Sequence, residues 1–316
     1  MTPVRIALIV SAVLVGSLVV IWLVFAFWRV RSEIKRRAAG APPLQSRRTV
    51  IWRDPGPAAS LDLAGGPGGR DGAPVPPFRF VEEHVAGTFP CVSVRDARDR
   101  VWRAKWGDEV HTETFAARLA WAAGYFVEVN YFVPSGQIEG AGTLQRARAC
   151  IEEDGRFCDA RFELDEPGVL KHFDEHSWAW HDNPFVGTRE LNGLKILMML
   201  VSNWDNKDVR DVARGSNTAI FEHRIGRDTL EARYLIIDWG AALGTWGSHV
   251  LSRGRWDCAA FAGQNDQFVL GANGDTVQWG YKGQRTADAV TDIRRSDVLW
   301  LYKYLGGSAT SSSPPA

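Results

Sequence analysis

A glutamate and a lysine near the start of the globular part of the chain are placed to form an ion pair. The sequence predicts a helix from about Asp108 to Gly124, and on it Glu113 shares a stripe with small residues, chiefly alanine. A carboxylate on the small-residue face of a helix faces a close neighbour rather than water. Lys105 lies near the end of the strand predicted just before this helix, and its long side chain is a candidate partner for Glu113.

Two further polar clusters each follow an apolar element. A helix predicted from Thr188 to Ser202 contains GLKILMMLV, which is apolar almost all round and therefore predicted to be buried. It leads directly into NWDNKD, which carries Asp205 and Lys207. A strand predicted from Tyr234 to Ile237 ends in DWG, residues 238–240.

The remaining elements suggest a sheet followed by a less regular middle. Short runs rich in Val, Phe and Trp, separated by turn residues, predict two successive antiparallel hairpins from three strands: Phe78–His84, Cys91–Arg95 and Val101–Trp106. Further on, the patterns predict strands at Val127–Val133 and Thr218–His223 and a short helix at Val169–Trp180.

The order of these features resembles the protein-kinase-like fold. A strand lysine, a helix glutamate, an Asp after a buried helix, an Asn before a strand and an Asp-x-Gly after the next strand occur in that order. The segments AGTFPCV, RAKWGDEVHTETFAARLAWAAGYF, NGLKILMMLVSNWDNKD and YLIIDWGAALG look most like the phosphoinositide-kinase-like and HipA-like branches. The resemblance covers roughly Phe78 to Leu305 and implies an α+β fold of two lobes, a small antiparallel-sheet lobe and a larger helical lobe.

The resemblance also implies roles for single residues in ATP-dependent phosphoryl transfer. Lys105, held by Glu113, would neutralise the α and β phosphates of ATP. Asp205 would orient or deprotonate the acceptor hydroxyl, and Lys207 would stabilise the transferring phosphoryl group. Asp238 would hold Mg²⁺.

The glycines and the second metal ligand complete the implied site. The turn Ala86-Gly87-Thr88 would lie over the phosphates, and Gly240 would let the chain turn tightly at the metal. A metal-binding asparagine is expected five residues after Asp205, where Arg210 stands. Asn217 directly precedes a strand, which is the usual context, so we assign it to the metal instead. The acceptor stays open between a protein, a lipid and a small molecule.

Three alternatives compete with a kinase. The domain could be a catalytically inactive scaffold of the same shape. Asp238 and Gly240 could simply form an Asx turn at the end of a strand. Finally, His172-Phe173-Asp174-Glu175-His176 matches H-x-x-E-H, in which two histidines one helical turn apart bind zinc in a metalloprotease and the glutamate activates water.

The N-terminal part predicts a membrane anchor. No residue from Ile6 to Trp28 is charged, and a run of this length crosses a bilayer core as one helix, preceded by the short end 1–5. Basic residues follow between Arg29 and Arg37, which places the C-terminal domain in the cytoplasm and the protein in the inner membrane. Residues 29–77 read as a basic, then Gly- and Pro-rich flexible linker, 78–307 as the kinase-like domain and 308–316 as a disordered tail.

Composition narrows the functional classes. The chain of 316 residues contains 37 Lys and Arg and 37 Asp and Glu, so its formal net charge gives no general affinity for nucleic acid. The four cysteines have no C-x-x-C spacing, which argues against a zinc ribbon.

Overall fold

The computed structural model describes residues 46–86, 89–172, 177–203, 217–227, 229–244, 258–263, 268–280 and 291–306. The chain divides into two compact units, Met1–Ser46 and Arg47–Ala316, and the sites described below lie in the second.

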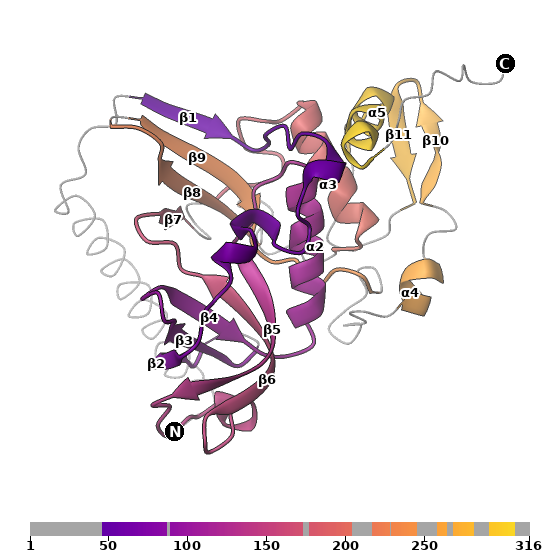
Figure 1. Ribbon diagram of the computed structural model, residues 1–316. Helices are drawn as coiled ribbons and strands as arrows, with labels where there is room; N and C mark the ends of the chain where they lie inside the picture. The colour runs from indigo at the N-terminus through magenta and orange to yellow at the C-terminus, as the bar shows by residue number, and fades with distance from the viewer. Residues whose placement is uncertain are drawn as a thin grey trace, which may run out of the picture. The chain divides into compact units, whose positions relative to one another are not determined.

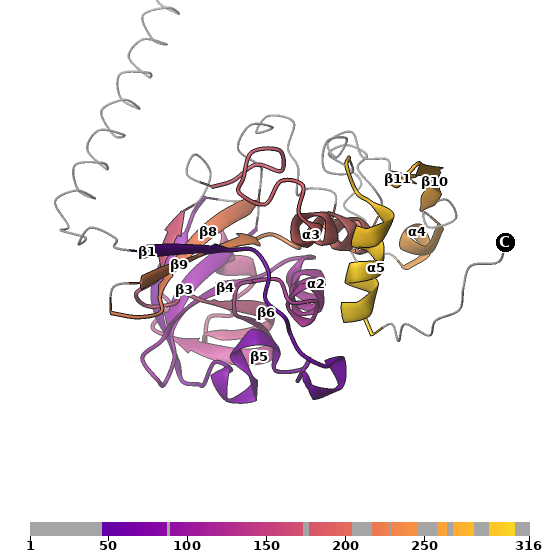
Figure 2. The same ribbon diagram turned by 90° about the horizontal axis from the view of Figure 1, so that it is seen from above.

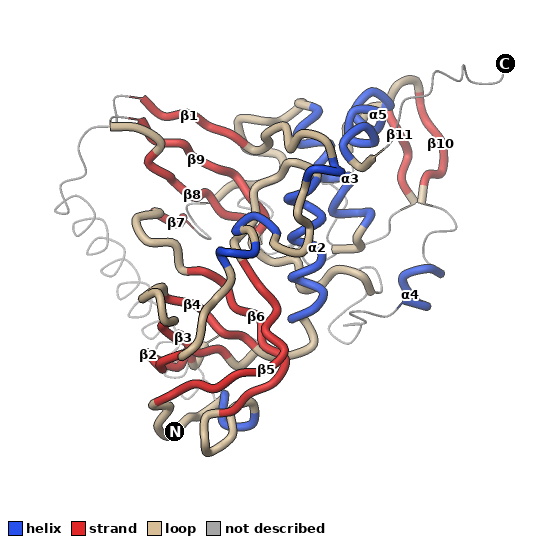
Figure 3. The backbone as a smooth tube through the Cα atoms, in the orientation of Figure 1, coloured by secondary structure: helices blue, strands red, loops and turns tan. Residues whose placement is uncertain are grey.

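Five strands form a closed barrel (Figures 1 and 3). They follow one another around it in the order β2-β3-β4-β6-β5. Neighbouring strands are antiparallel, except that β2 and β5 close the barrel as a parallel pair. The strands are β2 (Phe78–His84), β3 (Cys91–Arg95), β4 (Val101–Lys105), β5 (Asn130–Glu139) and β6 (Arg156–Leu164).

The barrel strands alternate between an apolar inner face and a charged outer face. Successive side chains of a strand point to opposite faces, so Trp102 and Ala104 in β4 and Ala160 and Phe162 in β6 fill the interior and are fully buried. The residues between and after them therefore point outward. Helix α2 (Val110–Ala122) packs against the outer side of β5 and β6, and it lies beside them in both views (Figures 1 and 2).

A second sheet and two further helices form the other half of the core. The sheet has the order β1-β9-β8-β7, and helices α3 and α5 pack against each other (Figure 2). Alanines of α2 share one apolar cluster with residues of α3, α5, β8 and β9. The elements are β1 (Ser46–Val50), β7 (Leu170–His172), α3 (Arg189–Leu200), β8 (Thr218–Arg224), β9 (Thr229–Ile236) and α5 (Arg295–Tyr304).

The remaining described elements are short. They are the helix α4 (Cys258–Gly263), the hairpin β10 (Val269–Asn273) and β11 (Thr276–Trp279), and the 3₁₀ turns η1 (Ala58–Ser60), η2 (Gly66–Gly68), η3 (Arg70–Gly72) and η4 (Ala147–Ala149).

The predicted two-lobed kinase-like fold is wrong. The N-terminal strands close into a barrel rather than remaining an open sheet, because β6 bridges β4 and β5 while β5 also pairs with β2. The described residues contain four α-helices, and the part after the barrel is built as much from strands as from helices. A larger helical lobe is therefore not what this part of the chain forms.

The predicted flexible linker is also wrong where the structure describes it. The apolar island at its centre, residues 50–52, is part of the core: Val50 and Ile51 are buried, and Trp52 donates from Nε1 to the carbonyl oxygen of Ala123. Burial of these side chains offsets the entropy cost of ordering the surrounding Gly- and Pro-rich sequence.

Several predicted elements differ in type or extent, among them a strand and a helix. The strand predicted to end at Pro134 runs on as β5 to Glu139, since β6 continues to pair with it. The helix predicted from Val169 begins instead as strand β7, whose residues pair with Glu222, Phe221 and Ile220 of β8.

The prediction of a single-pass inner-membrane protein is withdrawn. Within the ranges that the structure describes, no helix has the length and apolar character needed to span a bilayer. The predicted span, residues 6–28, lies outside those ranges, as do residues 29–45 and the predicted tail 308–316.

Candidate functional site

A cluster of three carboxylates surrounds the lysine that ends β4. Lys105 Nζ lies 3.0 Å from Glu109 Oε2 and 3.9 Å from Glu113 Oε2. Glu109, Glu113 and Asp238 each place a carboxylate oxygen within 4.8 Å of the others. The structure therefore brings three of the predicted site residues together, namely Lys105, Glu113 and Asp238, and adds Glu109. We call these four residues the acidic cluster.

Arg161 supports the cluster from the neighbouring strand. Arg161 of β6 is the register partner of Lys105, and its Nη1 lies 2.6 Å from Glu113 Oε1. Its Nη2 lies 3.0 Å from Glu163 Oε2. Lys105 and Arg161 both lie on the outer face of the barrel. Arg161 is nevertheless only 4% exposed, because α2 covers it. The helix carboxylate thus bridges two strand cations.

A second pair of acids lies behind Arg161. Burial, followed by the charge of Glu163, raises the pKa of Glu128 well above its ordinary value. Burial acts in the same direction on Glu163, but Arg161 and Lys171 outweigh it and lower the pKa of that carboxyl. The two carboxyl groups share a hydrogen bond, and the opposite directions of their pKa shifts give Glu128 the higher affinity for a proton. Arg161 thus forms an ion pair with one acid of each group, Glu113 in the acidic cluster and Glu163 in this second pair.

Protonation within the acidic cluster follows from its burial. Burial raises the pKa of Glu113 from 4.5 to about 7, against the opposing charges of Arg161 and Lys105. Burial would lower the pKa of Lys105, but Glu113, Asp238 and Glu109 outweigh this effect and hold it above its ordinary value. Lys105 therefore stays charged, whereas Glu113 changes charge near neutral pH.

The segment directly after β9 contributes Asp238 to the cluster. The backbone N–H of Gly240 donates to Asp238 Oδ1 at 2.9 Å, and the carbonyl oxygen of Asp238 accepts from Asn203 Nδ2 at 3.0 Å. The Asx-type bond considered from the sequence is thus present. It fixes the carboxylate in place.

Gly240 has a different role from the one the resemblance implied. Its φ is not in the left-handed region, so the turn itself does not require glycine. A Cβ at this position would instead lie 2.6 Å from Cδ and 2.8 Å from Cγ of Glu109. The missing side chain therefore makes room for Glu109 beside Lys105.

The other predicted site residues are only partly located. Asn217 precedes β8 with φ of +57°, and its carbonyl oxygen accepts from Ile237 N, so its backbone lies next to the residue before Asp238. Asp205, Lys207, Gly87 and Thr88 lie outside the described residues. Phe89, directly after the predicted phosphate turn, places its ring centroid 5.7 Å from Lys105 Nζ.

Of the zinc-protease motif, only the first residue, His172, lies in the part of the chain that the structure describes. His172 belongs to strand β7, and its Nε2 lies 3.5 Å from Glu222 Oε1 in the neighbouring strand. Residues 173–176 lie outside the described ranges. The helix that would align both histidines does not include His172.

Sequence reasoning missed Glu109 and Arg161. Glu109 stands one turn before Glu113, a spacing that places both on the same side of the helix start. Arg161 lies in RFCDARFEL, where apolar Ala160 and Phe162 alternate with charged Arg161 and Glu163 and mark the inner face of a strand. That alternation could have identified Arg161 and Glu163 as a charged pair on the outer face.

The acidic cluster has the chemistry of a cation site. Carboxylate oxygens are the ligands that hard divalent cations prefer. Glu113 Oε2 is buried and accepts no hydrogen bond from the described residues, with Lys105 Nζ 3.9 Å away. No family model matches this chain, and the searches of curated proteins and of solved structures likewise find no match.

Proposed function

We propose that this protein binds a nucleoside triphosphate together with a divalent cation at the acidic cluster and transfers its terminal phosphoryl group. The observation that carries the proposal is the position of Lys105, whose ammonium group lies against Glu109 and Glu113 while Asp238 completes the same cluster. Phosphoryl transfer needs cations against the phosphate oxygens and hard oxygen ligands for the metal. The proposal rests on this site and not on the fold.

Each residue has a distinct part in this proposal. Asp238 and Glu109 supply carboxylate oxygens to the cation, which would offset the charge of the phosphates when bound. Lys105 contacts the phosphate chain. Glu113 positions Lys105 and is itself held by Arg161, so the amine is fixed before the nucleotide arrives. Asp205 is proposed to orient the acceptor hydroxyl, with Lys207 beside the transferring group.

Nucleotide binding tests the proposal. The full-length chain should be used, because residues 50–52 belong to the core. Its melting temperature should rise with ATP and Mg²⁺ and return to the starting value when EDTA is added, since a ligand that binds only the folded state stabilises it. The absence of any shift at millimolar ATP and Mg²⁺ would contradict the proposal. Stabilisation by zinc alone would favour the metalloprotease.

Turnover separates an enzyme from an inactive scaffold. Asp205→Asn should leave the ATP–Mg²⁺ shift close to that of the parent and abolish phosphoryl transfer, because the proposed role of this residue is toward the acceptor. Transfer can be followed with γ-labelled ATP, with water, membrane lipids and added protein as acceptors. Nucleotide binding without transfer to any of them would indicate a scaffold.

A further inference from the structure

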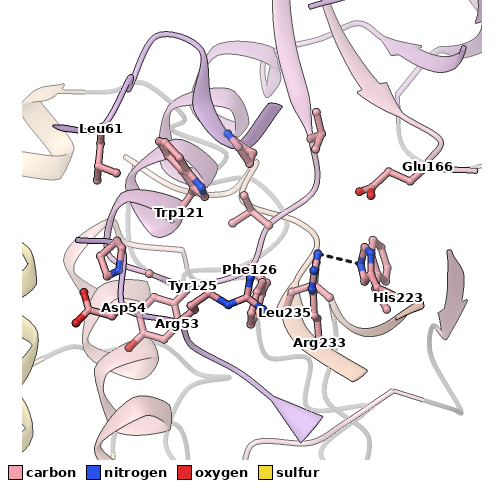
Figure 4. Close-up of a pocket in the computed structure, with 16 residues that line it drawn as sticks. Arg53, Asp54, Leu61, Trp121, Tyr125, Phe126, Glu166, His223, Arg233 and Leu235 are labelled. Carbon is pink, nitrogen blue, oxygen red and sulfur yellow. Dashed lines mark hydrogen bonds between the residues drawn. The ribbon is translucent and has the colours of Figure 1, made fainter. Parts of the chain in front are cut away.

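A cavity beside strands β8 and β9 is separate from the acidic cluster (Figure 4). Its volume of about 410 Å³ falls in the range typical of small-molecule sites. The segment after β1, the residues that follow α2 and side chains of the two strands line it. None of Lys105, Glu109, Glu113 or Asp238 is part of the lining, so a ligand of this cavity is distinct from the proposed nucleotide.

The cavity contains a carboxyl group that has no partner. Glu166 lies in the loop between β6 and β7, and its carboxyl group points into the cavity (Figure 4). It forms no hydrogen bond and no ion pair with the described residues. Burial raises the pKa of Glu166, and the charges of Lys171 and Arg233 oppose this effect only in part. A carboxylate that loses water without gaining a partner is destabilised, so a ligand that supplies donors to Glu166 would be stabilised there.

The two arginines of the cavity are already bound to another acid. Arg53 Nη2 donates to both oxygens of Glu231, at 2.8 and 2.9 Å, and Arg233 Nε donates to Oε1 of the same residue at 2.8 Å. Their guanidinium carbons also lie 5.4 and 5.2 Å from the centroid of the Phe126 ring. Because Glu231 is buried, both arginines are fixed on the wall across the cavity from Glu166 (Figure 4).

The charges around the cavity leave one negative charge in excess when Glu166 is ionised. The positive groups in the lining are Arg53 and Arg233. Three carboxylates stand against these two cations: Asp54 and Glu166 line the cavity as well, and Glu231 binds both arginines. This balance disfavours an anionic ligand and suits a ligand that carries one positive charge.

The neighbouring titratable groups do not change this balance. Lys171 Nζ lies 3.6 Å from Asp165 Oδ1, so these two charges next to Glu166 compensate each other. His223 lies 3.4 Å from Arg233 Nη1, and burial together with that arginine lowers the pKa of His223 to about 4. Its imidazole is therefore neutral at pH 7 and adds no positive charge to the cavity.

The rest of the lining is largely aromatic or aliphatic. Trp121 lies across the cavity from Phe126 in Figure 4, and the apolar surface is extended by Leu61, Val127, Val129 and Leu235. An ammonium group has three donors and no acceptor, which matches a carboxylate that lacks donors. From this geometry we infer that the cavity binds a monocationic amine with an apolar body, whose ammonium group lies on Glu166 and whose body packs against Trp121.

Calorimetry with three probes of one shape tests this inference. Tryptamine carries an ammonium group at pH 7, tryptophol replaces it with a neutral hydroxyl, and indoleacetate carries a carboxylate instead. Tryptamine should bind the full-length protein, and tryptophol should bind at least about tenfold more weakly, because it lacks the charge-assisted hydrogen bond to Glu166. Indoleacetate should bind more weakly than both. Equal binding of tryptophol, tighter binding of indoleacetate, or no binding of tryptamine would each overturn the inference.

Two variants and a matched control locate the binding. Glu166→Gln keeps the shape of the side chain and removes its charge, so it should weaken tryptamine binding at least about tenfold and leave tryptophol binding unchanged. Leu61→Trp should block both probes by placing a larger side chain in the cavity without changing its charge. Glu153→Gln, at an exposed acid, should bind both like the parent.

The pattern across the probes distinguishes a charge effect from general damage to the fold. A structural defect in Glu166→Gln would weaken tryptamine and tryptophol alike, and that result would contradict the role of Glu166. Unchanged tryptamine binding in Glu166→Gln would contradict it as well. Unchanged binding in Leu61→Trp would place the amine outside this cavity.

Discussion

Lys105 and Arg161 are register partners on the adjacent strands β4 and β6, so two cations lie side by side on the outer face of the barrel. Like charges directly opposite each other destabilise a sheet. Glu113, reaching from α2, lies within ion-pair distance of both and is itself 2% exposed. The arrangement holds an amine in a fixed position at the cost of burying charge.

Removal of the buried cation should destabilise the protein strongly. Arg161→Met leaves Glu113 and Glu163 without their main buried partner, and breaking such a pair typically costs about 3–5 kcal/mol. Urea denaturation measures the change. The double variant Arg161→Met with Glu113→Gln should recover part of the loss, because one uncompensated carboxylate is removed as well. A matched surface control, Arg156→Met, should change the unfolding free energy little.

The raised pKa of Glu113 predicts a particular pH dependence of stability. Between its ordinary value of 4.5 and its folded value of about 7, the folded state binds more protons than the unfolded state, so stability falls as the pH rises through this window. Because one pKa unit corresponds to about 1.4 kcal/mol, the full effect is about 3 kcal/mol. Glu113→Gln removes this contribution.

Denaturation of the parent and of Glu113→Gln at pH 5 and pH 8 checks this prediction. The parent should lose stability relative to the variant on going from pH 5 to pH 8. Glu153→Gln, at an exposed acid, serves as the control and should follow the parent. Parallel behaviour of Glu113→Gln and the parent would show that Glu113 keeps an ordinary pKa in the folded protein.

A methyl group at position 240 should displace Glu109 from Lys105. In Gly240→Ala the new Cβ would lie 2.6 Å from Cδ of Glu109, so the carboxylate must move. Metal-dependent nucleotide affinity should then fall by about tenfold or more, as it does when groups that orient a metal site are disturbed. Gly142→Ala adds a Cβ in open space and should leave affinity unchanged. If Gly240→Ala binds the metal and nucleotide as tightly as the parent, Glu109 is not part of the site.

Local patterns in the sequence predicted much of the region around the acidic cluster. The first two barrel strands match their predicted bounds, and α2 and α3 lie within their predicted ranges with Thr188 capping α3. The pairing of Lys105 with Glu113 follows from helix periodicity, because small residues on one face of α2 leave room for a neighbour. The position of Asp238 follows from the strand predicted from Tyr234 to Ile237, because Asp238 comes directly after it.

Long-range pairing was not predictable in the same way. Closure of the barrel depends on β6, whose charged outer residues obscure its inner apolar series, and on parallel pairing of β2 with β5 across more than fifty residues of sequence. Likewise, distant partners order the Gly- and Pro-rich segment before β2: Trp52 donates to the carbonyl oxygen of Ala123, and the hydroxyl of Tyr131 donates to that of Gly69. Composition alone does not reveal such a partner.

Binding of Mn²⁺ in the presence of ATP, followed by electron paramagnetic resonance, tests the central claim most directly. Mn²⁺ takes the place of Mg²⁺ and reports cation binding without any need for turnover. The parent protein should bind Mn²⁺–ATP, and Asp238→Asn, which removes the charge but keeps the shape, should lower the affinity by about 100-fold or more with folding little changed. Asp275→Asn, at an exposed aspartate between β10 and β11, should bind like the parent. If Asp238→Asn binds Mn²⁺–ATP as tightly as the parent, the acidic cluster is not a metal–nucleotide site.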